Sequence, residues 1–440
     1  MYLKGSKLSM NRRRNRGNPV LIIFLLISIG LLVYVNVLVV PKINPPFVPT
    51  PTPTRDPVWY ATEAADQFGQ GKFNNAIETY QQAINSHPGE IDYYLKVARL
   101  LIYTNQYEQA KVQSENAILL NNKVADAYAL LGWAEGFMQN YKDGEIAARK
   151  AVELDPNNGL AHAALAYILA LRVEARVDDL NTMDLAIAES RTALALNPGL
   201  VEAHWARGYV LEVTSNYADA IAEYEKALQF NPNIATLHLA LGRNLFTQNE
   251  LSRAILEFTK AYSLNPTNGE PNFYISRVWA NQGEWAKAIQ YANQALKDDP
   301  GNARYHAQLG SMIYRSGQLR SSLPSFELAL LGGTTPEGIA VEPLKLEIGT
   351  TSVNYYSQYG IALAKLNRCD EAVSIATTMQ QTIPDDETGI FNANEMIRIC
   401  QENLKNPPTP EPTATPTPIT GPTPTPNGTQ MPQLTPLTTP

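Results

Sequence analysis

Small apolar residues recur along this chain with a fixed period of 34 residues. One series of alanines keeps this period, apart from a single step of 42 residues, and consists of Ala83, Ala117, Ala151, Ala193, Ala227, Ala261, Ala295 and Ala329. A second series of small residues runs seven positions ahead, at Ala76, Ala110, Gly144, Ala186, Ala220, Ala254, Ala288 and Ser322. Prolines follow in register at Pro88, Pro156, Pro198, Pro232, Pro266 and Pro300. A period of this length predicts a helix–turn–helix unit repeated along one elongated domain.

Each unit is expected to hold a first helix, a short turn, a second helix and a polar break. Alanines in the second helix let neighbouring helices approach closely, and aromatic residues one turn later fill the gap, as at Tyr80, Tyr224, Phe258 and Phe326. Proline after the second helix ends it. The eight expected units together span residues 57–336 and begin at residues 57, 91, 125, 159, 201, 235, 269 and 303.

The repeated pattern resembles the tetratricopeptide repeat family. That family places an aromatic residue, a Leu-Gly pair and a second aromatic in the first helix, and then an alanine, a phenylalanine and a proline. The matching residues are Tyr128, Leu131, Gly132, Leu241, Gly242, Ala254, Phe258 and Pro266. The resemblance covers about residues 57 to 386. It implies an all-α, right-handed α-solenoid whose concave groove binds peptides or partner proteins.

Two stretches depart from the period. The unit at 159–200 carries eight extra residues around 172–182, which are expected to form an enlarged loop or extended helix ends. Residues 337–352 form a spacer, expected to be a small β-hairpin or a strap. A degenerate ninth unit follows at 353–386, and residues 387–405 are expected to cap the solenoid with one more helix.

The N-terminal region is expected to anchor the chain in a membrane. Residues 1–18 are basic, and residues 19–40 form an uncharged apolar stretch. Its 21 residues from Val20 to Val40 would span roughly 31 Å as a helix, about one hydrocarbon core. The positive-inside rule then places residues 1–18 in the cytoplasm and the repeats and tail outside it. A cleaved signal peptide is the alternative, but its apolar core would be shorter and would end in small residues.

Proline and threonine dominate both flanks of the repeats. Residues 41–56 read as a stiff, extended linker. Residues 406–440 are rich in Thr-Pro steps and are expected to be disordered, because they cannot bury a core. Whether this tail is bare or carries sugars is left open.

Charge and cysteine content restrict the class of partner and the state of the cysteines. The formal net charge of −7 and a pI of about 5.4 argue against nucleic acid, whose phosphates need a basic surface. The two cysteines, Cys369 and Cys400, both lie in the last folded segment. Outside the cytoplasm we expect them to form a disulfide, and the alternative is a pair of buried free thiols.

The sequence carries no sign of catalysis. It has no Gly-rich phosphate loop, no His-Glu-x-x-His and no Gly-x-Ser-x-Gly, so we expect no enzyme activity and no cofactor. His162, His204, His238 and His306 share the fourth position of their units. Stacked helices lie roughly 8–10 Å apart, so one metal ion could not gather these side chains. They are expected to be half-buried packing residues, and no metal site is predicted.

The resemblance places the first helices on the concave face, and the candidate binding residues are their arginines and aromatics. These residue types anchor many interfaces, and arginines pair with the carboxylates of acidic or C-terminal peptides. Some of the aromatics could equally belong to the core. The carboxylate clamp of two lysines and two asparagines found in chaperone-binding members is not evident. The candidates are Arg99, Tyr103, Trp133, Phe137, Tyr167, Trp205, Tyr209, Arg243, Phe246, Phe273, Arg277, Tyr314 and Arg315.

The sequence therefore predicts a membrane-anchored scaffold that presents a groove for a protein or peptide outside the cytoplasm. One alternative is a structural spacer at the cell surface, in contact with cell wall or glycans through its Thr/Pro tail. A second is a carbohydrate-binding accessory unit, because aromatic faces also stack on sugars. The identity of the partner and the oligomeric state are left open.

Overall fold

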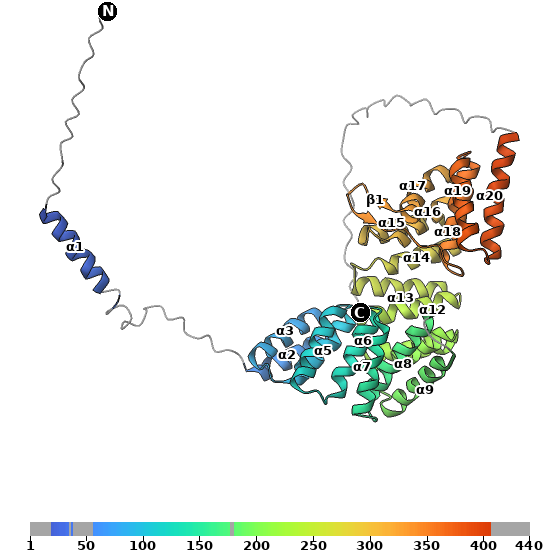
Figure 1. The fold of residues 1–440 in the computed structure, drawn as a ribbon. Helices are drawn as coiled ribbons and strands as arrows, with labels where there is room; N and C mark the ends of the chain where they lie inside the picture. Colours follow the sequence, from blue (N-terminus) through green and yellow to red (C-terminus); the bar gives the residue numbers. More distant parts are fainter. Residues whose placement is uncertain (1–18, 35–36, 38–55, 177–179, 406–440) are drawn as a thin grey trace, which may run out of the picture. The chain divides into compact units, whose positions relative to one another are not determined.

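The computed structural model describes residues 19–34, 37, 56–176 and 180–405. Within this part the chain forms 20 helices and two short strands (Figure 1). The basic segment 1–18, the linker 41–56 except its last residue, and the tail 406–440 lie outside the described residues, so the predictions made for them stay predictions. The chain packs as two units, residues 1–97 and residues 98–440.

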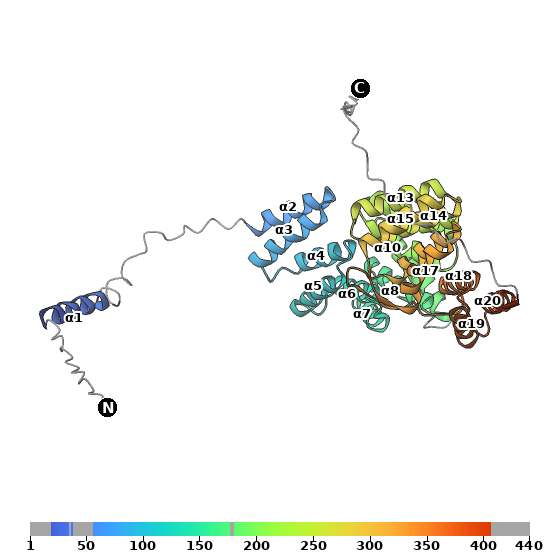
Figure 2. The same cartoon turned by 90° about the horizontal axis from the view of Figure 1, so that it is seen from above.

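Helices alternate as first and second members of successive antiparallel pairs (Figure 2). The first helices are α2 (Pro57–Gly69), α4 (Ile91–Tyr103), α6 (Ala125–Phe137), α8 (Gly159–Glu174), α10 (Val201–Val213), α12 (Ala235–Thr247), α14 (Glu270–Asn281), α16 (Ala303–Arg315) and α18 (Thr351–Lys365). The second helices are α3 (Phe73–Ser86), α5 (Tyr107–Leu120), α7 (Tyr141–Leu154), α9 (Leu180–Leu196), α11 (Tyr217–Phe230), α13 (Leu251–Leu264), α15 (Trp285–Asp298), α17 (Leu319–Leu331) and α19 (Cys369–Thr382). The predicted all-α solenoid of helix–turn–helix repeats is confirmed.

Most pairs are joined by the same tight turn, in which one residue takes a left-handed backbone conformation. These residues are Gly71, Asn105, Gln139, Ser215, Asn249, Gly283, Gly317 and Asn367. The next residue donates its N–H back into the first helix, as Asn216 does to the carbonyl of Leu211 at 2.8 Å. This bond satisfies a carbonyl that the helix end would leave without a donor.

In the pairs α10–α11, α12–α13 and α16–α17, a glycine in the first helix faces an aromatic ring from the second helix. A Cβ atom built on Gly242 would lie 2.5 Å from the Phe258 ring, and one on Gly208 would lie 2.8 Å from Tyr224. Both rings are fully buried. The missing side chain thus sets how closely the two helices approach, and the ring fills the space between them.

The two irregular stretches show where the extra residues go. In the unit with eight extra residues, α8 and α9 are longer than their counterparts, with 16 and 17 residues, and residues 177–179 between them lie outside the described part. After α17 the chain forms a two-stranded antiparallel hairpin from β1 (Gly333–Thr334) and β2 (Ala340–Val341). The hydroxyl of Tyr356 ties the following loop to α17, because it donates to the carbonyls of Leu330 and Leu344.

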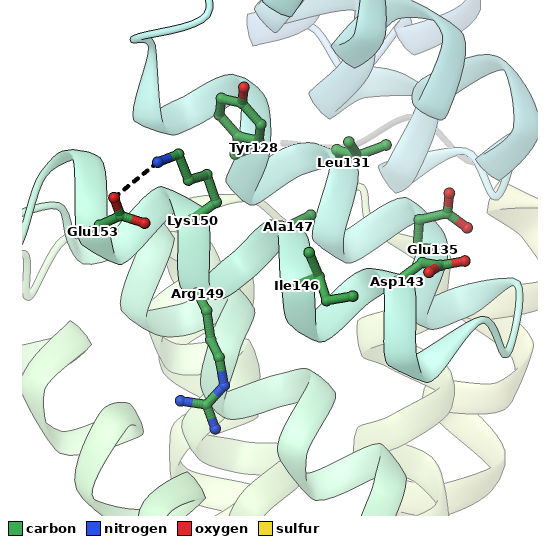
Figure 3. Close-up of a pocket in the computed structure, with 9 residues that line it drawn as sticks. All are labelled: Tyr128, Leu131, Glu135, Asp143, Ile146, Ala147, Arg149, Lys150 and Glu153. Carbon is green, nitrogen blue, oxygen red and sulfur yellow. Dashed lines mark hydrogen bonds and ion pairs between the residues drawn. The ribbon is translucent and has the colours of Figure 1, made fainter.

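The second helices carry charged side chains that bond to one another on the outer surface. On α7, the Nζ atom of Lys150 lies 2.9 Å from the Glu153 carboxylate (Figure 3). Lys111 on α5 lies 2.7 Å from the Glu135 carboxylate on α6. The Lys150–Glu153 pair is exposed and contributes little to stability, whereas Glu135 of the other pair is buried.

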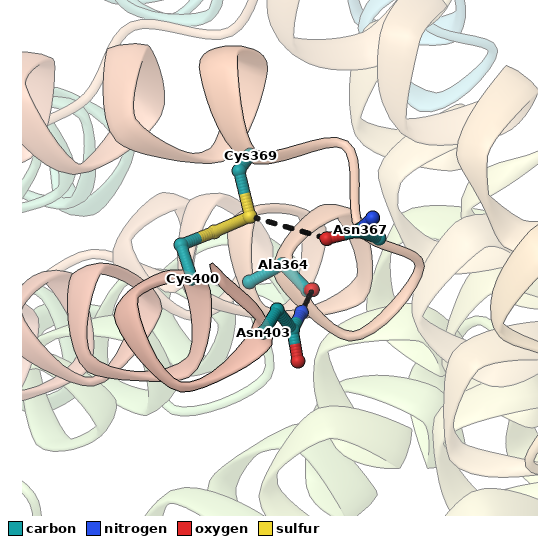
Figure 4. The surroundings of a disulfide bond; sticks show 5 residues. All are labelled: Ala364, Asn367, Cys369, Cys400 and Asn403. Atoms are coloured by element: carbon teal, nitrogen blue, oxygen red, sulfur yellow. Dashed lines mark hydrogen bonds between the residues drawn. A yellow bond between two sulfur atoms is a disulfide. The ribbon is translucent and has the colours of Figure 1, made fainter. Parts of the chain in front are cut away.

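The C-terminal helix α20 (Glu387–Lys405) lies beside α18 and α19 (Figure 1). Its buried residues Ala393, Met396 and Cys400 cover the end of the core. Cys400 forms a disulfide with Cys369 at the start of α19, with the two Cα atoms 5.5 Å apart (Figure 4). Beside it, the Asn403 side chain donates to the carbonyl of Ala364 at 2.9 Å. The predicted disulfide is confirmed.

The predicted membrane anchor falls only partly within the described residues. Helix α1 (Pro19–Tyr34) has 16 residues, and apolar side chains such as Phe24, Ile27 and Leu32 are exposed. Among the described residues, no helix combines the length and the hydrophobicity that a membrane crossing requires. Residues 35–36 and 38–40 of the predicted segment are not described, and the anchor stays a prediction.

We predict that Gly242→Ala destabilises the fold. The new Cβ would overlap the buried Phe258 ring, and the cost of overpacking should exceed the gain of about 1 kcal/mol in helix propensity. Urea titration should show a fall of roughly 1–2 kcal/mol in the free energy of unfolding. Gly199→Ala is the control, because its Cβ would meet only ordinary contacts at 3.8 and 4.0 Å. An equal loss of stability in both variants would contradict the role of the contact between Gly242 and the Phe258 ring.

We predict that removing the disulfide loosens α20. Closing a loop over a sequence separation of 31 residues stabilises a fold by about 3–4 kcal/mol in the chain-entropy model. The double variant Cys369→Ser, Cys400→Ala should lower the free energy of unfolding and raise amide exchange in α19 and α20. Reducing agent should lower the free energy of unfolding of the unaltered chain and raise its amide exchange in α19 and α20, but it should leave the variant unchanged. A response of the variant to reducing agent would show that the effect does not come from the disulfide.

Candidate functional site

Eleven of the thirteen predicted groove residues fall into a mostly buried group and an accessible group, both within residues 98–440. The buried group comes from α4, α6, α8 and α10. The rings of Trp133 and Tyr167 stack with centroids 4.4 Å apart, and Trp205 lies 5.1 Å from Trp133. Phe137 and Tyr209 extend this cluster, at 5.7 Å from Trp205 and 4.6 Å from Tyr167 respectively. These side chains of α6, α8 and α10 contact one another on the inner face of the stack.

Polar contacts between distant units close this inner face further. Tyr103 on α4 donates its hydroxyl to the Glu202 carboxylate on α10 at 2.7 Å, and Arg99 lies 3.1 Å from the same carboxylate. Burial raises the pKa of Tyr103 well above its usual value, so the hydroxyl keeps its proton as the donor. Thr236 on α12 also bonds Asn105, 2.8 Å away. Tyr103, Trp133, Tyr167, Trp205 and Tyr209 are buried and hold the inner face together, whereas Arg99 and Phe137 are partly exposed.

The accessible group lines a hollow farther along the chain. This hollow, of about 480 Å³, is bordered by α12, α14, α16 and α18 and continues into a second of about 610 Å³, which shares Phe246 and Arg277 with it. We call the two together the arginine groove. Its first part is lined by Phe246, Arg277, Ala280, Asn281, Gln308, Ser311, Met312, Arg315, Thr351, Asn354, Tyr355 and Gln358.

The arginines of this groove differ in whether they have an acidic partner. Arg243 lies 3.0 Å from the Glu212 carboxylate, which also accepts bonds from Asn244 and Tyr224. Burial acts to lower the pKa of Arg243, but Glu212 and other neighbours outweigh it and raise that pKa. Arg243 is therefore part of a structural network, and its charge is already neutralised.

Arg277 occupies the equivalent position one unit later, but its acidic partner is missing. The residue 31 positions earlier is Glu212 for Arg243 and Phe246 for Arg277. The Arg277 guanidinium accordingly lies over the Phe246 ring, 5.6 Å from its centroid, and that of Arg315 lies 4.6 Å from the Trp285 ring. Within the described residues, neither guanidinium has a carboxylate within ion-pair distance. Both keep donors available to an anionic group in the groove.

Two further predicted residues lie outside this groove surface. Phe273 is buried under the guanidinium of Arg304, which is 4.2 Å from its ring centroid. Tyr314 packs against the core formed by α16 to α20. The assignment of all thirteen residues to a partner-binding groove stays a prediction, and the structure shows which of them are accessible.

Sequence reasoning missed the amide side chains of the arginine groove. Asn354 and Gln358 lie one turn apart on α18, and Gln308 on α16 accepts a bond from the buried Tyr355 hydroxyl. The side-chain oxygen of Gln358 is buried and has no partner within the described part of the chain. The four-residue spacing of Asn354 and Gln358 is the sequence signal that places both amides on one face of a helix.

A further surface hollow is less suited to binding. It has about 500 Å³ and lies between α6 and α7 (Figure 3). Its charged groups Glu135, Lys150 and Glu153 already bond to one another or to Lys111. Among the described residues, no cluster of three or more His, Cys, Asp or Glu side chains could hold a metal ion. The arginine groove is therefore the candidate site.

Comparisons with known proteins match the repeats in sequence. Profiles of the tetratricopeptide repeat match residues 125–158, 201–234 and 245–310. A human protein, "Protein O-mannosyl-transferase TMTC1", is 24% identical over 153 residues, which are 35% of this chain and 17% of that protein. The "Heat-shock protein cognate (HSC) co-chaperone sgt12" of Aspergillus fumigatus is 29% identical over 109 residues, which are 25% of this chain and 31% of that protein.

A bacterial relative is similar over a shorter stretch. The "Type IV pilus assembly protein PilF" of Pseudomonas aeruginosa is 35% identical over 78 residues, which are 17% of this chain and 30% of that protein. A solved structure described as "Functional Characterization of Pseudomonas Aeruginosa pilF" aligns with a TM-score of 0.38 and 23% identity, over 46% of this chain and 90% of that one. The chain spans between 17% and 31% of the length of the three curated relatives. The matched profiles and the paired helices together show that this chain contains tetratricopeptide repeats, at residues 125–158, 201–234 and 245–310.

Proposed function

We propose that this protein is a membrane-anchored scaffold that binds an acidic, extended segment of a partner protein in the arginine groove. The observation that carries the proposal is the pair of guanidinium groups, on Arg277 and Arg315, that line the groove without an acidic partner in the described part of the chain. Tetratricopeptide repeats act as scaffolds for protein–protein interaction, and two of the relatives are named as a co-chaperone and an assembly protein.

The chemistry of the groove favours an acidic peptide. A guanidinium group offers a planar pair of donors that fits a carboxylate. The amides of Asn354 and Gln358 provide both donors and acceptors, which the backbone of an extended peptide requires. Phe246 and Met312 add apolar surface for the side chains between the acidic ones. No catalytic role is part of this proposal.

We predict that Arg277→Ala, Arg315→Ala weakens the binding of an acidic peptide at least tenfold. Each lost bond to a charged group removes about 1.5–3 kcal/mol, and a tenfold change needs about 1.4 kcal/mol. The measurement is fluorescence anisotropy of a labelled ten-residue glutamate peptide with the full-length chain. A ten-residue lysine peptide should not bind.

The matched control for this experiment is Arg253→Ala. Arg253 is half-exposed on α13 and already pairs with Glu225 and Glu250, so its loss changes the net charge without touching the groove. The proposal fails if this control weakens binding as much as the groove variant does. If no acidic peptide binds at all, the alternative hypothesis is favoured, in which the protein is a structural spacer that contacts cell wall or glycans.

The membrane anchor and the location outside the cytoplasm belong to the same proposal. The uncharged run from Val20 to Val40 supports an anchor, and so do the exposed apolar side chains of α1. The disulfide between Cys369 and Cys400 supports an oxidising compartment, because cytoplasmic thiols are kept reduced. Residues 19–40 would then attach the chain to the bilayer.

We predict that Ile27→Lys, Leu31→Lys releases the protein from membranes. Each lysine at the centre of an apolar span costs about 2.5–3.5 kcal/mol, and both side chains are exposed on α1. The measurement is the fraction of the full-length chain that stays in the membrane pellet after an alkaline wash. Gln82→Lys, at an exposed position of α3, should remain in the pellet. Retention of the double variant would argue against the anchor.

A further inference from the structure

Three histidines of successive first helices make the same pair of contacts. In each, the Nε2 atom faces the carbonyl oxygen of the proline six residues earlier, at 2.9, 2.9 and 2.8 Å. The Nδ1 atom faces a glutamate carboxylate on the second helix of the same unit, at 2.6 Å for His204 and 2.5 Å for His238. We call each set a clasp; the three are His162–Glu189–Pro156, His204–Glu223–Pro198 and His238–Glu257–Pro232.

The two contacts of a clasp require one proton more than a neutral histidine and an ionised glutamate hold. A carbonyl oxygen and an ionised carboxylate only accept hydrogen bonds, whereas a neutral imidazole has one N–H and one lone pair. Both contacts are satisfied together when the ring is an imidazolium. Without that proton, two lone pairs face each other at hydrogen-bond distance in a site where each histidine residue is at most 7% exposed.

The surrounding charges favour the protonated clasp. The hydrogen bond to Glu189 raises the pKa of His162, with support from the Pro156 carbonyl and Asp155, although burial acts in the opposite direction. Burial acts to raise the pKa of Glu223, but His204 and Lys226 outweigh it and lower that pKa. Glu257 has a lowered pKa for the same reasons, with His238 and Lys260 as its partners.

We infer that the three clasps form a proton-controlled brace, in which one bound proton per clasp stiffens the segment from α8 to α13 and its loss loosens that segment. Each clasp joins the first helix, the second helix and the turn that precedes them, so it fixes how one unit stacks on the unit before it. The braced segment includes α10 and α12, which carry Glu212, Arg243 and Phe246 of the arginine groove. The inference is independent of what the groove binds.

The brace should be strongest in mildly acidic solution. The pKa of His162 is raised from 6.5, so its contribution to stability is complete below about pH 6.5 and is lost as the pH rises through the raised value. The pKa values of Glu223 and Glu257 are lowered from 4.5, so their contribution is present above that pH and is lost as the pH falls through the lowered values.

The chain contains its own control in His306. This residue of α16 makes the same contact with the carbonyl of Pro300, at 2.9 Å. The glutamates of the clasps at His204 and His238 lie 19 positions after the histidine, but the corresponding residue after His306 is Ser325. A neutral imidazole can satisfy the single remaining contact, so α16 and α17 should not respond to pH in this range.

Hydrogen exchange of the full-length chain at pH 6 and pH 8, corrected for intrinsic rates, tests the brace. Protection in α8 to α13 should fall from pH 6 to pH 8, by up to tenfold per pH unit for one proton lost, while α16 and α17 stay unchanged. In Glu189→Gln, Glu223→Gln, Glu257→Gln, the amide donates to the neutral Nδ1 atom and Nε2–H still donates to the proline carbonyl. The clasps then persist without the proton, and the pH dependence of protection should vanish.

A variant that should gain pH dependence provides the second part of the test. Ser325→Glu supplies His306 with a carboxylate at the spacing of the other clasps, so α16 and α17 should acquire the pH dependence that they lack. The inference is overturned if the triple glutamine variant keeps the pH dependence of the unaltered chain. It is also overturned if α16 and α17 respond to pH in the unaltered chain as strongly as α8 to α13 do. Failure of Ser325→Glu to confer a response would overturn it even if the triple variant did not fold.

Discussion

The contact between a glycine of one helix and an aromatic ring of its partner is the constraint on which the repeats depend. Gly242 has no Cβ because the Phe258 ring occupies that space, and the same arrangement recurs at Gly208 and Gly310. The ring can be fully buried only if both helices are held at a short, fixed separation. The pairs that contain this contact thereby acquire a similar shape, which favours regular stacking of neighbouring units. The left-handed turn residue and the alanine series serve this geometry.

Local features of the sequence were sufficient to predict the helix pairs, because each pair is built from contacts within about 34 residues. The disulfide was also predictable, since Cys369 and Cys400 flank one helical hairpin. The exposure of side chains on the inner face could not be predicted from the sequence. Whether Trp205 is a surface residue or a core residue depends on the curvature of the stack, which sums small rotations over several units. The contact between Tyr103 and Glu202 joins residues 99 positions apart, beyond the reach of any local pattern.

The candidate site was predictable only at the level of residue type. Arg243 and Arg277 hold equivalent positions in successive units, so these positions alone do not show which arginine has an acidic partner. The difference lies 31 residues earlier, where Glu212 is replaced by Phe246. One substitution in the preceding first helix turns a neutralised arginine into one that faces a hollow with its charge available. Functional specialisation in a repeated fold can thus arise from breaking a pair at one unit while the scaffold stays intact.

The contacts across the inner face change how this solenoid would come apart under tension. In a stack where each unit touches only its neighbours, a pulling force peels units away one at a time from an end. Here Tyr103 and Asn105 are tied to α10 and α12, several units onward, through Glu202 and Thr236. The helices enclosed by these ties cannot be extended singly, because releasing one requires breaking the shared aromatic cluster. Residues 98 to 247 should therefore yield as one block, at a higher force than the units that follow them.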